Sequence, residues 1–139
     1  MDYEGQRAYV NETNAFMRLC GITVTRVEKD FAVAELTAGP ESLNPGGTLH
    51  GGALYTLADA AATTAARTDG HRYATADGDI RYHRAVSAGV VRAAASVRHR
   101  GRSLCSAAVE ITDESGRLLA DASFSIFRLA PIDLPAFQD

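Results

Sequence analysis

The feature that most constrains the fold is an alanine-rich segment that follows a glycine- and proline-rich loop. The loop, residues 39–50, contains Gly39, Pro40, Pro45, Gly46 and Gly47 and is longer than most connections inside a domain. Residues 52–67 then hold seven alanines and few large side chains. Because alanine has the highest helix propensity and leaves room on every face, this segment is predicted to be a helix enclosed by the rest of the domain.

The flanking segments predict one helix and six strands. Residues 3–19 are predicted to be a helix that ends at Gly21, with Tyr9, Phe16 and Leu19 on its apolar face. Period-two patterns predict the strands. These strands are residues 22–28, 31–37, 73–83, 90–99, 103–112 and 117–129. Tight turns at 29–30 and 113–116 make the sheet antiparallel, and one long helix on one face gives an α+β domain.

Length and composition place the chain among ordinary globular proteins. With 139 residues we expect a single domain over 1–139, with a core at about 20–130 and an extended or mobile C-terminal tail at 131–139. The net charge of −3 gives no reason to expect nucleic acid as a partner. No apolar run approaches 18 residues and no signal peptide is recognisable, so neither a membrane nor export is expected and the cytoplasm is the predicted location. Cys20 and Cys105 have no metal-ligand spacing, so no metal site is expected.

The candidate site lies where the loop meets the helix. Asn44 is in the loop, His50-Gly51-Gly52 stands at the helix start, and Asp59 follows about two turns into the apolar helix. The first N–H groups of a helix have no partner within it, and glycine lets a ligand approach the backbone closely. Such a helix start can stabilise a carbonyl oxygen that becomes negative, while the carboxylate drives the attack on the carbonyl carbon.

Each of these residues also has a purely structural interpretation. Asp59 could lie on a solvated face or pair with an arginine, and Gly51 could simply form a turn. His50 and Asn44 could shape the loop through capping hydrogen bonds or bind near the reacting carbonyl. If Asp59 is catalytic, it acts either as a general base or as a nucleophile that forms a mixed anhydride.

The motif and the order of elements together resemble the hotdog fold, and in particular the PaaI-like acyl-CoA thioesterases of phenylacetate pathways. The resemblance covers residues 10–130 and rests on Asn44, on His50-Gly51-Gly52, and on Asp59 nine residues after His50. It implies an antiparallel sheet wrapped around the central helix. It also implies that Thr75 helps to place the attacking water, although Asp77 and Asp79 make this strand more acidic than is usual in the family.

The resemblance implies hydrolysis of an aromatic acyl-CoA, phenylacetyl- or hydroxybenzoyl-like, or of a medium-chain acyl-CoA. The products are the free acid and coenzyme A, and no cofactor is expected because coenzyme A is part of the substrate. Candidates for substrate binding are Gly52, Tyr55, Tyr82, Arg81 and Arg84. Further candidates for the coenzyme phosphates or the acyl group are Arg98, Arg100, Arg102 and Phe16. The run of alanines in the helix is expected to widen the acyl pocket.

The spacing of Gly51 and Asp59 also predicts self-association. Eight residues on one helix span about 12 Å, whereas both groups must lie about 3 Å from one reacting thioester. Two antiparallel copies solve this problem, with Gly51 of one chain facing Asp59 of the other. The prediction is an obligate homodimer with sites at the interface, and the resemblance implies a homotetramer built from two dimers.

Four other functions compete with acyl-CoA hydrolysis. The chain could be a non-catalytic acyl-CoA-binding protein, or a thioesterase that acts on acyl-carrier-protein thioesters. A hotdog dehydratase or hydratase fits less well, because those enzymes pair a histidine and an acid in a different arrangement. A structural interaction domain is disfavoured by the acidic Asp59 within an apolar helix.

Overall fold

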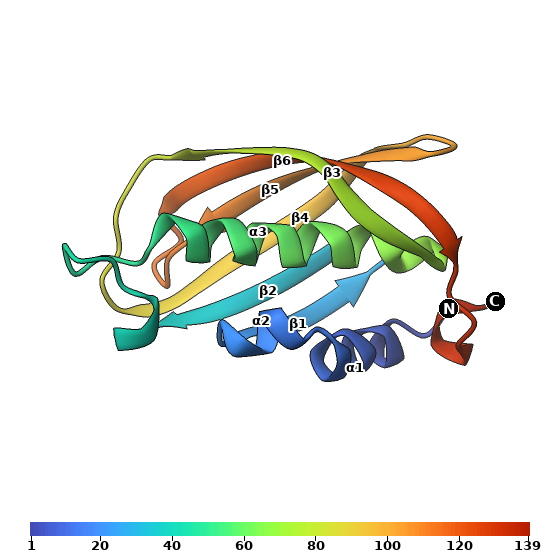
Figure 1. Cartoon of the computed structure of the whole chain (residues 1–139), viewed down its shortest axis with the longest axis horizontal. Helices are drawn as coiled ribbons and strands as arrows, with labels where there is room; N and C mark the ends of the chain where they lie inside the picture. Colours follow the sequence, from blue (N-terminus) through green and yellow to red (C-terminus); the bar gives the residue numbers. More distant parts are fainter.

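The computed structural model describes all 139 residues and shows an antiparallel sheet wrapped around one long helix (Figure 1). The elements are α1 (Tyr3–Thr13), α2 (Ala15–Leu19), β1 (Ile22–Glu28), β2 (Phe31–Ala38), α3 (Gly51–Ala66), β3 (His71–Tyr82), β4 (Gly89–Arg100), β5 (Leu104–Thr112) and β6 (Leu118–Pro131). Short 3-10 turns lie at Pro40–Ser42, Arg67–Asp69 and Pro135–Phe137. The strand order is β1-β2-β4-β5-β6-β3, and neighbouring strands are antiparallel throughout. The predicted α+β hotdog architecture is therefore confirmed.

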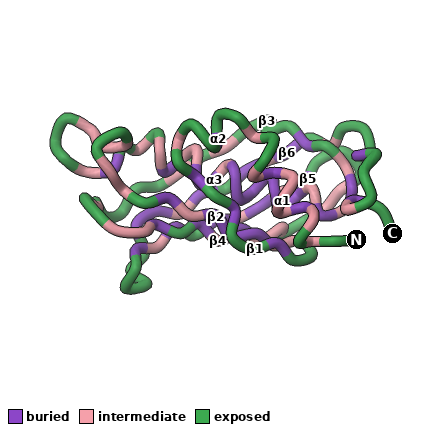
Figure 2. Tube along the Cα trace, turned by 90° about the horizontal axis from the view of Figure 1, so that it is seen from below, coloured by how far each residue is buried: buried purple, intermediate pink, exposed green.

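The helix α3 packs closely on the sheet because small side chains meet from both sides. Its buried face is mostly alanine, and alanines also cover the strands opposite. The buried alanines of the strands include Ala32, Ala34, Ala93, Ala95 and Ala107. Figure 2 shows burial concentrated along α3 and the strands beside it. Small residues in contact allow a helix and a sheet to approach without cavities, so the composition of α3 fixes its central position.

The predicted N-terminal helix is interrupted. Residues 3–19 form two helices, α1 and α2, which are separated at Asn14. The backbone of Asn14 leaves the helical region (φ −84°, ψ 89°), and its side chain accepts a hydrogen bond from the Met17 N–H at 3.2 Å. Asparagine favours such N-cap positions because its side chain can replace a missing backbone acceptor.

The break at Asn14 overturns the predicted apolar face. Val10 and Met17 are the buried hydrophobic residues of these helices, whereas Phe16 is 61% exposed and Leu19 is 82% exposed. The prediction was wrong because it continued one helical periodicity through a point where the chain changes direction. Phe16 and Leu19 consequently remain available at the surface.

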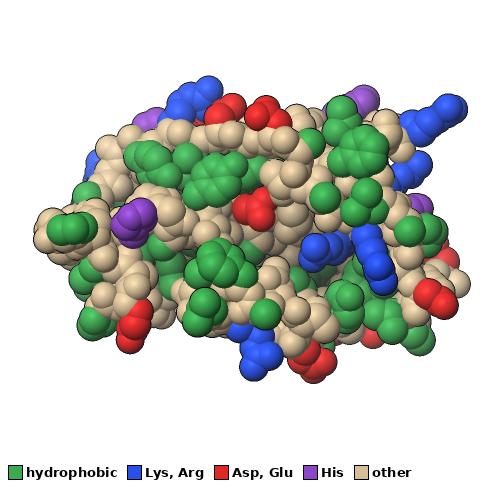
Figure 3. Space-filling view, in the orientation of Figure 1, with side chains coloured by type: hydrophobic (Ala, Val, Ile, Leu, Met, Phe, Trp, Pro, Cys, Tyr) green, Lys and Arg blue, Asp and Glu red, His purple; other side chains and the backbone are tan.

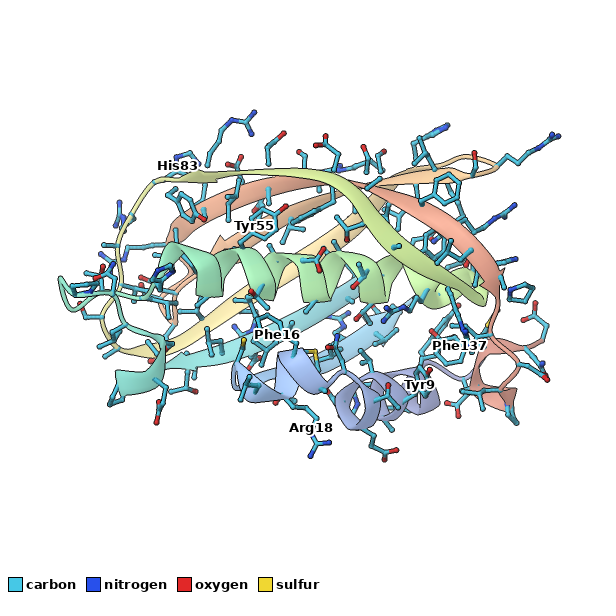
Figure 4. All side chains as sticks on the ribbon, in the orientation of Figure 1. Tyr9, Phe16, Arg18, Tyr55, His83 and Phe137 are labelled. Carbon is cyan, nitrogen blue, oxygen red and sulfur yellow. The ribbon has the colours of Figure 1, made fainter.

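The C-terminal tail is docked, contrary to the prediction that 131–139 is extended or mobile. Phe137 is buried, and its ring meets the edge of the Tyr9 ring with 5.3 Å between centroids (Figure 4). The Gln6 side chain donates a hydrogen bond to the Ala136 carbonyl at 3.0 Å. These partners come from the other end of the chain, so no local pattern in the sequence announces them.

The strand β3 forms one edge of the sheet. It pairs with β6 on one side only, and most of its residues are exposed (Figure 1). The pairing shifts between Thr75 and Asp77, which marks a β-bulge at this point. A long unprotected edge strand such as β3 is a template for pairing with another chain.

No helix of the structure is both long and apolar enough to cross a bilayer.

Candidate active site

The helix α3 has one open face in its N-terminal half. Residues 60–66 are buried without exception, whereas Gly52 is exposed and Thr56 and Asp59 are half-buried. The spacing of Gly52, Thr56 and Asp59 places them along one stripe of the helix. On this face of the molecule, one acidic side chain lies among hydrophobic ones (Figure 3). A carboxylate in such surroundings is a candidate for chemistry rather than for solvation.

The structure brings Asp59 and Thr75 together. The Thr75 hydroxyl donates a hydrogen bond to Asp59 Oδ1 at 2.5 Å, although the two residues belong to different elements, α3 and β3. The bulge that follows Thr75 explains this geometry, since bulges redirect the side chains beside them. The second oxygen, Oδ2, accepts no hydrogen bond from the protein. The carboxylate is therefore held in place by one oxygen and free to take a proton with the other.

The start of α3 carries one free backbone donor. His50 is the N-cap, and its Nδ1 accepts a hydrogen bond from the Gly52 N–H at 2.8 Å, which requires that this nitrogen carry no proton. Gly51 is the first helical residue, and its N–H has no partner in the chain. The Tyr82 hydroxyl donates to the Gly51 carbonyl at 2.8 Å. The Gly51 N–H is thus held in position and available to an anionic oxygen.

Asn44 organises the loop before the helix. Its Nδ2 donates to the Thr48 hydroxyl at 2.8 Å, and its Oδ1 accepts from the Thr48 N–H at 3.2 Å. Backbone bonds from Leu49 to the Val86 carbonyl and from His50 to the Ser42 carbonyl fasten the same loop. The side chains of Asn44 and His50 therefore both make local loop and capping hydrogen bonds. These bonds fix the direction of the Gly51 N–H.

Tyr55 lies on the side of α3 that faces β3 and β6, opposite Phe16 (Figure 4). Its ring meets the edge of the Phe124 ring at 5.5 Å. A Cβ atom at Gly78 would come within 2.5 Å of the Tyr55 hydroxyl, so only glycine fits there. Burial raises the pKa of the Tyr55 phenol, and the nearby Asp59 carboxylate raises it further. Tyr55 is thus a neutral donor close to the candidate carboxylate.

The arginine candidates separate into free and engaged side chains. Arg84 is exposed and has no ion-pair partner, while Arg81 lies 3.5 Å from an exposed aspartate, Asp79. Arg100 is engaged at the far end of α3, where it pairs with Asp30 at 2.6 Å and with Asp69 at 3.0 Å. The structure therefore removes Arg100 from the candidates for phosphate binding. Two further candidates are exposed without ion-pair partners, namely Arg98 and Arg102.

A pocket of about 670 Å³, here called the apolar pocket, opens beside the N-terminal half of α3. Its wall combines α2, β2, the loop and α3, and includes Phe16, Leu19, Leu36, Leu43, His50, Gly52, Ala53 and Thr56. Local sequence patterns did not indicate most of this wall. Ala53 is the one alanine of α3 in it, because the other six lie against the sheet or off this face. The expectation that the alanine run widens an acyl pocket stays a prediction, to which this pocket contributes only Ala53.

The candidate groups for acyl transfer lie in two separate parts of α3. The unpartnered Gly51 N–H lies at the start of α3, and the Asp59–Thr75 pair lies eight residues later, about 12 Å along the axis. No group of three His, Cys, Asp or Glu side chains comes together that could hold a metal ion.

Comparison with known proteins agrees with this description. A family model for the thioesterase superfamily matches residues 46–120, which include α3, β3, β4 and β5. The acyl-coenzyme A thioesterase PaaI of Escherichia coli (strain K12) is 30% identical over 110 residues, covering 78% of this chain and 79% of that protein. The chain belongs to the thioesterase superfamily.

Comparison with solved structures assigns the chain to a narrower group within this superfamily. The E. coli PaaI protein from the phenylacetic acid degradation operon superposes with a TM-score of 0.86 at 26% identity, over 92% of this chain and 94% of that one. A variant of the phenylacetic acid degradation protein PaaI from Thermus thermophilus gives a TM-score of 0.78 at 33% identity, over 82% and 98% of the two chains. The protein is a PaaI-like thioester hydrolase with the hotdog fold.

Proposed function

We propose that the protein hydrolyses the thioester of an aromatic or medium-chain acyl-CoA, using Asp59 and the Gly51 N–H. The observation that carries this proposal is the Asp59–Thr75 hydrogen bond on the open face of α3, which leaves one carboxylate oxygen free. The similarity to a protein named acyl-coenzyme A thioesterase supports the substrate class. Phenylacetyl- and hydroxybenzoyl-like groups are the aromatic candidates, since two structural relatives are named for phenylacetic acid degradation.

Asp59 acts through its free oxygen. As a general base, Oδ2 takes a proton from a water as the water oxygen attacks the thioester carbon, and the Gly51 N–H stabilises the resulting oxyanion. The carbon–sulfur bond then breaks, and the coenzyme A thiolate receives the proton that Asp59 took from water. In the alternative, Oδ2 attacks the carbon itself, and water hydrolyses the mixed anhydride. If water attacks the Asp59 carboxyl carbon of the anhydride, ¹⁸O from labelled water enters Asp59 during a single turnover, which the general-base path cannot produce.

The complete site is formed by two copies of the chain. Since Gly51 and Asp59 of one helix are about 12 Å apart, they cannot serve one carbonyl carbon. A second copy that pairs along the β3 edge would set the two α3 helices antiparallel, with Gly51 of one copy opposite Asp59 of the other. The unprotected β3 edge supports this arrangement. A homodimer is the minimal active unit, and a homotetramer of two such dimers is the assembly that we infer.

The apolar pocket supports an acyl group of substantial size. It adjoins His50 and Gly52 at the start of α3, and Phe16 and Leu36 provide its apolar lining. Pockets for small molecules commonly occupy about 300–1,000 Å³, so its volume suits an aromatic or medium-chain group. Tyr82 and Arg84 are the remaining binding candidates near the loop, at and just beyond the end of β3. The reaction needs only water and the substrate, of which coenzyme A is a part.

A thiol-release assay over a panel of acyl-CoAs, with the wild type and Asp59→Asn side by side, tests the proposal. We expect release from aromatic or medium-chain members, and a fall of about 10²- to 10⁴-fold in kcat for Asp59→Asn. Asp133→Asn is the matched control, because it makes the same change at an exposed position in the C-terminal segment. Circular dichroism establishes that each variant is folded.

Three outcomes would contradict the proposal. Near-normal turnover in Asp59→Asn would show that Asp59 is not the catalytic carboxylate. Thiol release from acyl-carrier-protein thioesters, but not from acyl-CoAs, would identify the carrier-protein thioester as the substrate. Tight binding of acyl-CoAs without any cleavage would identify a binding protein that has the same fold and pocket.

A further inference from the structure

A second pocket, here called the arginine pocket, lies at the opposite end of α3. It has a volume of about 420 Å³ and lies between the α1–α2 junction, the end of α3 and strand β3. Two arginines line it, Arg67 at the end of α3 and Arg72 at the start of β3. Tyr9 and Asn14 add polar groups, and apolar residues complete the wall. No acidic side chain contributes to it.

Neither arginine has a counter-ion. No carboxylate lies within ion-pair distance of Arg67 or Arg72, and neither side chain donates a hydrogen bond within the protein. Arg67 is half-buried, and this burial lowers the pKa of its guanidinium. A cation that has lost part of its hydration without gaining a partner is costly unless an anion completes its surroundings.

The neighbouring carboxylates are already engaged elsewhere. Asp69 accepts a hydrogen bond from the Tyr73 hydroxyl at 2.7 Å and pairs with Arg100 at 3.0 Å. Asp30 pairs with Arg100 at 2.6 Å. Arg100 also donates to the Ala66 carbonyl at the end of α3, so Arg67 is not needed to satisfy that carbonyl. The charge of Asp59 acts on Arg67 and partly offsets the effect of burial on its pKa, but no carboxylate lies within ion-pair distance of either arginine.

We infer that the arginine pocket binds an anionic group of the substrate, with Arg67 and Arg72 as the two cationic contacts. Guanidinium groups bind phosphate and carboxylate oxygens through paired N–H donors. The Tyr9 hydroxyl and Asn14 Nδ2 make no hydrogen bonds within the protein, so they are free to contribute as well. The pocket thus recognises a terminal phosphate or carboxylate rather than the reacting thioester.

The position of Arg67 connects this pocket with the Asp59 site. Asp59, Thr63 and Arg67 follow one another at intervals of four residues, which keeps them close to one face of the helix. The backbone positions of Asp59 and Arg67 are about 12 Å apart along the helix axis, so an anion held by Arg67 belongs to a part of the substrate other than the reacting thioester. It is either a phosphate of coenzyme A or a carboxylate at the far end of the acyl group, and this assignment to a substrate rests on the proposed function.

Calorimetric binding tests the inference without depending on turnover. Coenzyme A and pantetheine, which lacks the nucleotide phosphates, are titrated into the wild type, Arg67→Gln and Arg72→Gln. Arg18→Gln is the matched control, since Arg18 points away from α3 (Figure 4). If the anion is a phosphate, Arg67→Gln weakens coenzyme A binding by about tenfold or more, the size expected for a charge-assisted hydrogen bond, and leaves pantetheine binding unchanged.

A second set of titrations covers the carboxylate. Two acyl-CoAs of equal length, one ending in a carboxylate and one in a methyl group, are titrated into Asp59→Asn with and without Arg67→Gln. A loss confined to the carboxylate ligand assigns the anion to the acyl group. Arg72 is exposed, so Arg72→Gln provides a folded variant even if Arg67→Gln does not fold. If no arginine substitution changes the affinity of any of the four ligands relative to the protein that keeps the arginine, the inference is overturned, whether or not the protein hydrolyses acyl-CoA.

Discussion

Apart from Arg67, the polar groups around the C-terminal end of α3 are more completely satisfied within the chain than those in its N-terminal half. At the C-terminal end, Arg100 joins the Asp30 and Asp69 carboxylates, the Tyr73 hydroxyl and the Ala66 carbonyl in one network. Burial and the hydrogen bond to Asp69 raise the pKa of Tyr73 to about 12, so the phenol remains a donor there. This network connects α3 to the β1–β2 turn, to β3 and to β4.

The N-terminal half of α3, in contrast, carries polar groups that the chain leaves without partners. The Gly51 N–H has no partner, Asp59 uses one of its two oxygens, and the apolar pocket opens beside them. Unsatisfied groups on an otherwise well-packed helix are costly unless a ligand completes them. The comparison teaches that the Arg100 network holds the helix in place, whereas the start and middle of the helix present groups for chemistry.

After Asp59→Asn, the largest effect is expected from removing the Gly51 N–H. Proline is favoured at the first helical position and lacks this hydrogen, so Gly51→Pro deletes the donor at a position that accepts the ring. Gly51→Ala is the matched control, because it adds the same Cβ, 3.2 Å from Tyr82, and keeps the N–H. In thiol-release assays we expect Gly51→Pro to lose about 10²- to 10³-fold in kcat relative to Gly51→Ala. Equal rates for the two variants would exclude the N–H from catalysis.

A smaller effect, on stability rather than turnover, is expected from Arg100→Met. The substitution leaves Asp30 and Asp69 without their cation in a partly buried network. We expect a loss of roughly 2 kcal/mol in the free energy of unfolding, which is less than for a fully buried pair. Denaturant titration measures this loss, and kcat per folded molecule should stay near the wild-type value. A large fall in kcat without a loss of stability would reverse the roles assigned to the two ends.

The smallest effect is expected at the N-cap. His50→Ala removes the acceptor for the Gly52 N–H and should cost about 1 kcal/mol, whereas His50→Asn supplies a new capping oxygen and should recover most of it. Thermal melts measure both. If His50→Asn is stable but loses most of its kcat, His50 has a direct part in catalysis beyond its cap.

The sequence predicted the fold because local patterns determine it. Alternation in the strands, turn residues at 29–30 and 113–116, and the alanine content of α3 are all visible without tertiary information. The burial of Phe137 was missed because its partner, Tyr9, comes from the other end of the chain, whereas the break at Asn14 was missed because one helical periodicity was continued through a local N-cap. Local patterns also gave no warning that Phe16 would be exposed.

The sequence indicated only part of the candidate site that the structure describes. Gly51 and Asp59 stood out from the loop-to-helix motif, but the proximity of Thr75 to Asp59 depends on a bulge that spacing does not reveal. Arg100 was misassigned because a basic residue beside a turn gives no sign of its carboxylate partners. Arg67 was overlooked, although its interval of eight residues from Asp59 places it near the same face of the helix.

The most direct test of the central claim is complementation between Asp59→Asn and Gly51→Pro. If each site combines Gly51 of one protomer with Asp59 of the other, a mixed dimer contains one intact site and one doubly defective site. Random pairing of equal amounts, by co-expression, should then restore about a quarter of wild-type thiol release, although each variant alone is inactive. A mixture no more active than the two variants measured separately would contradict a site shared between protomers.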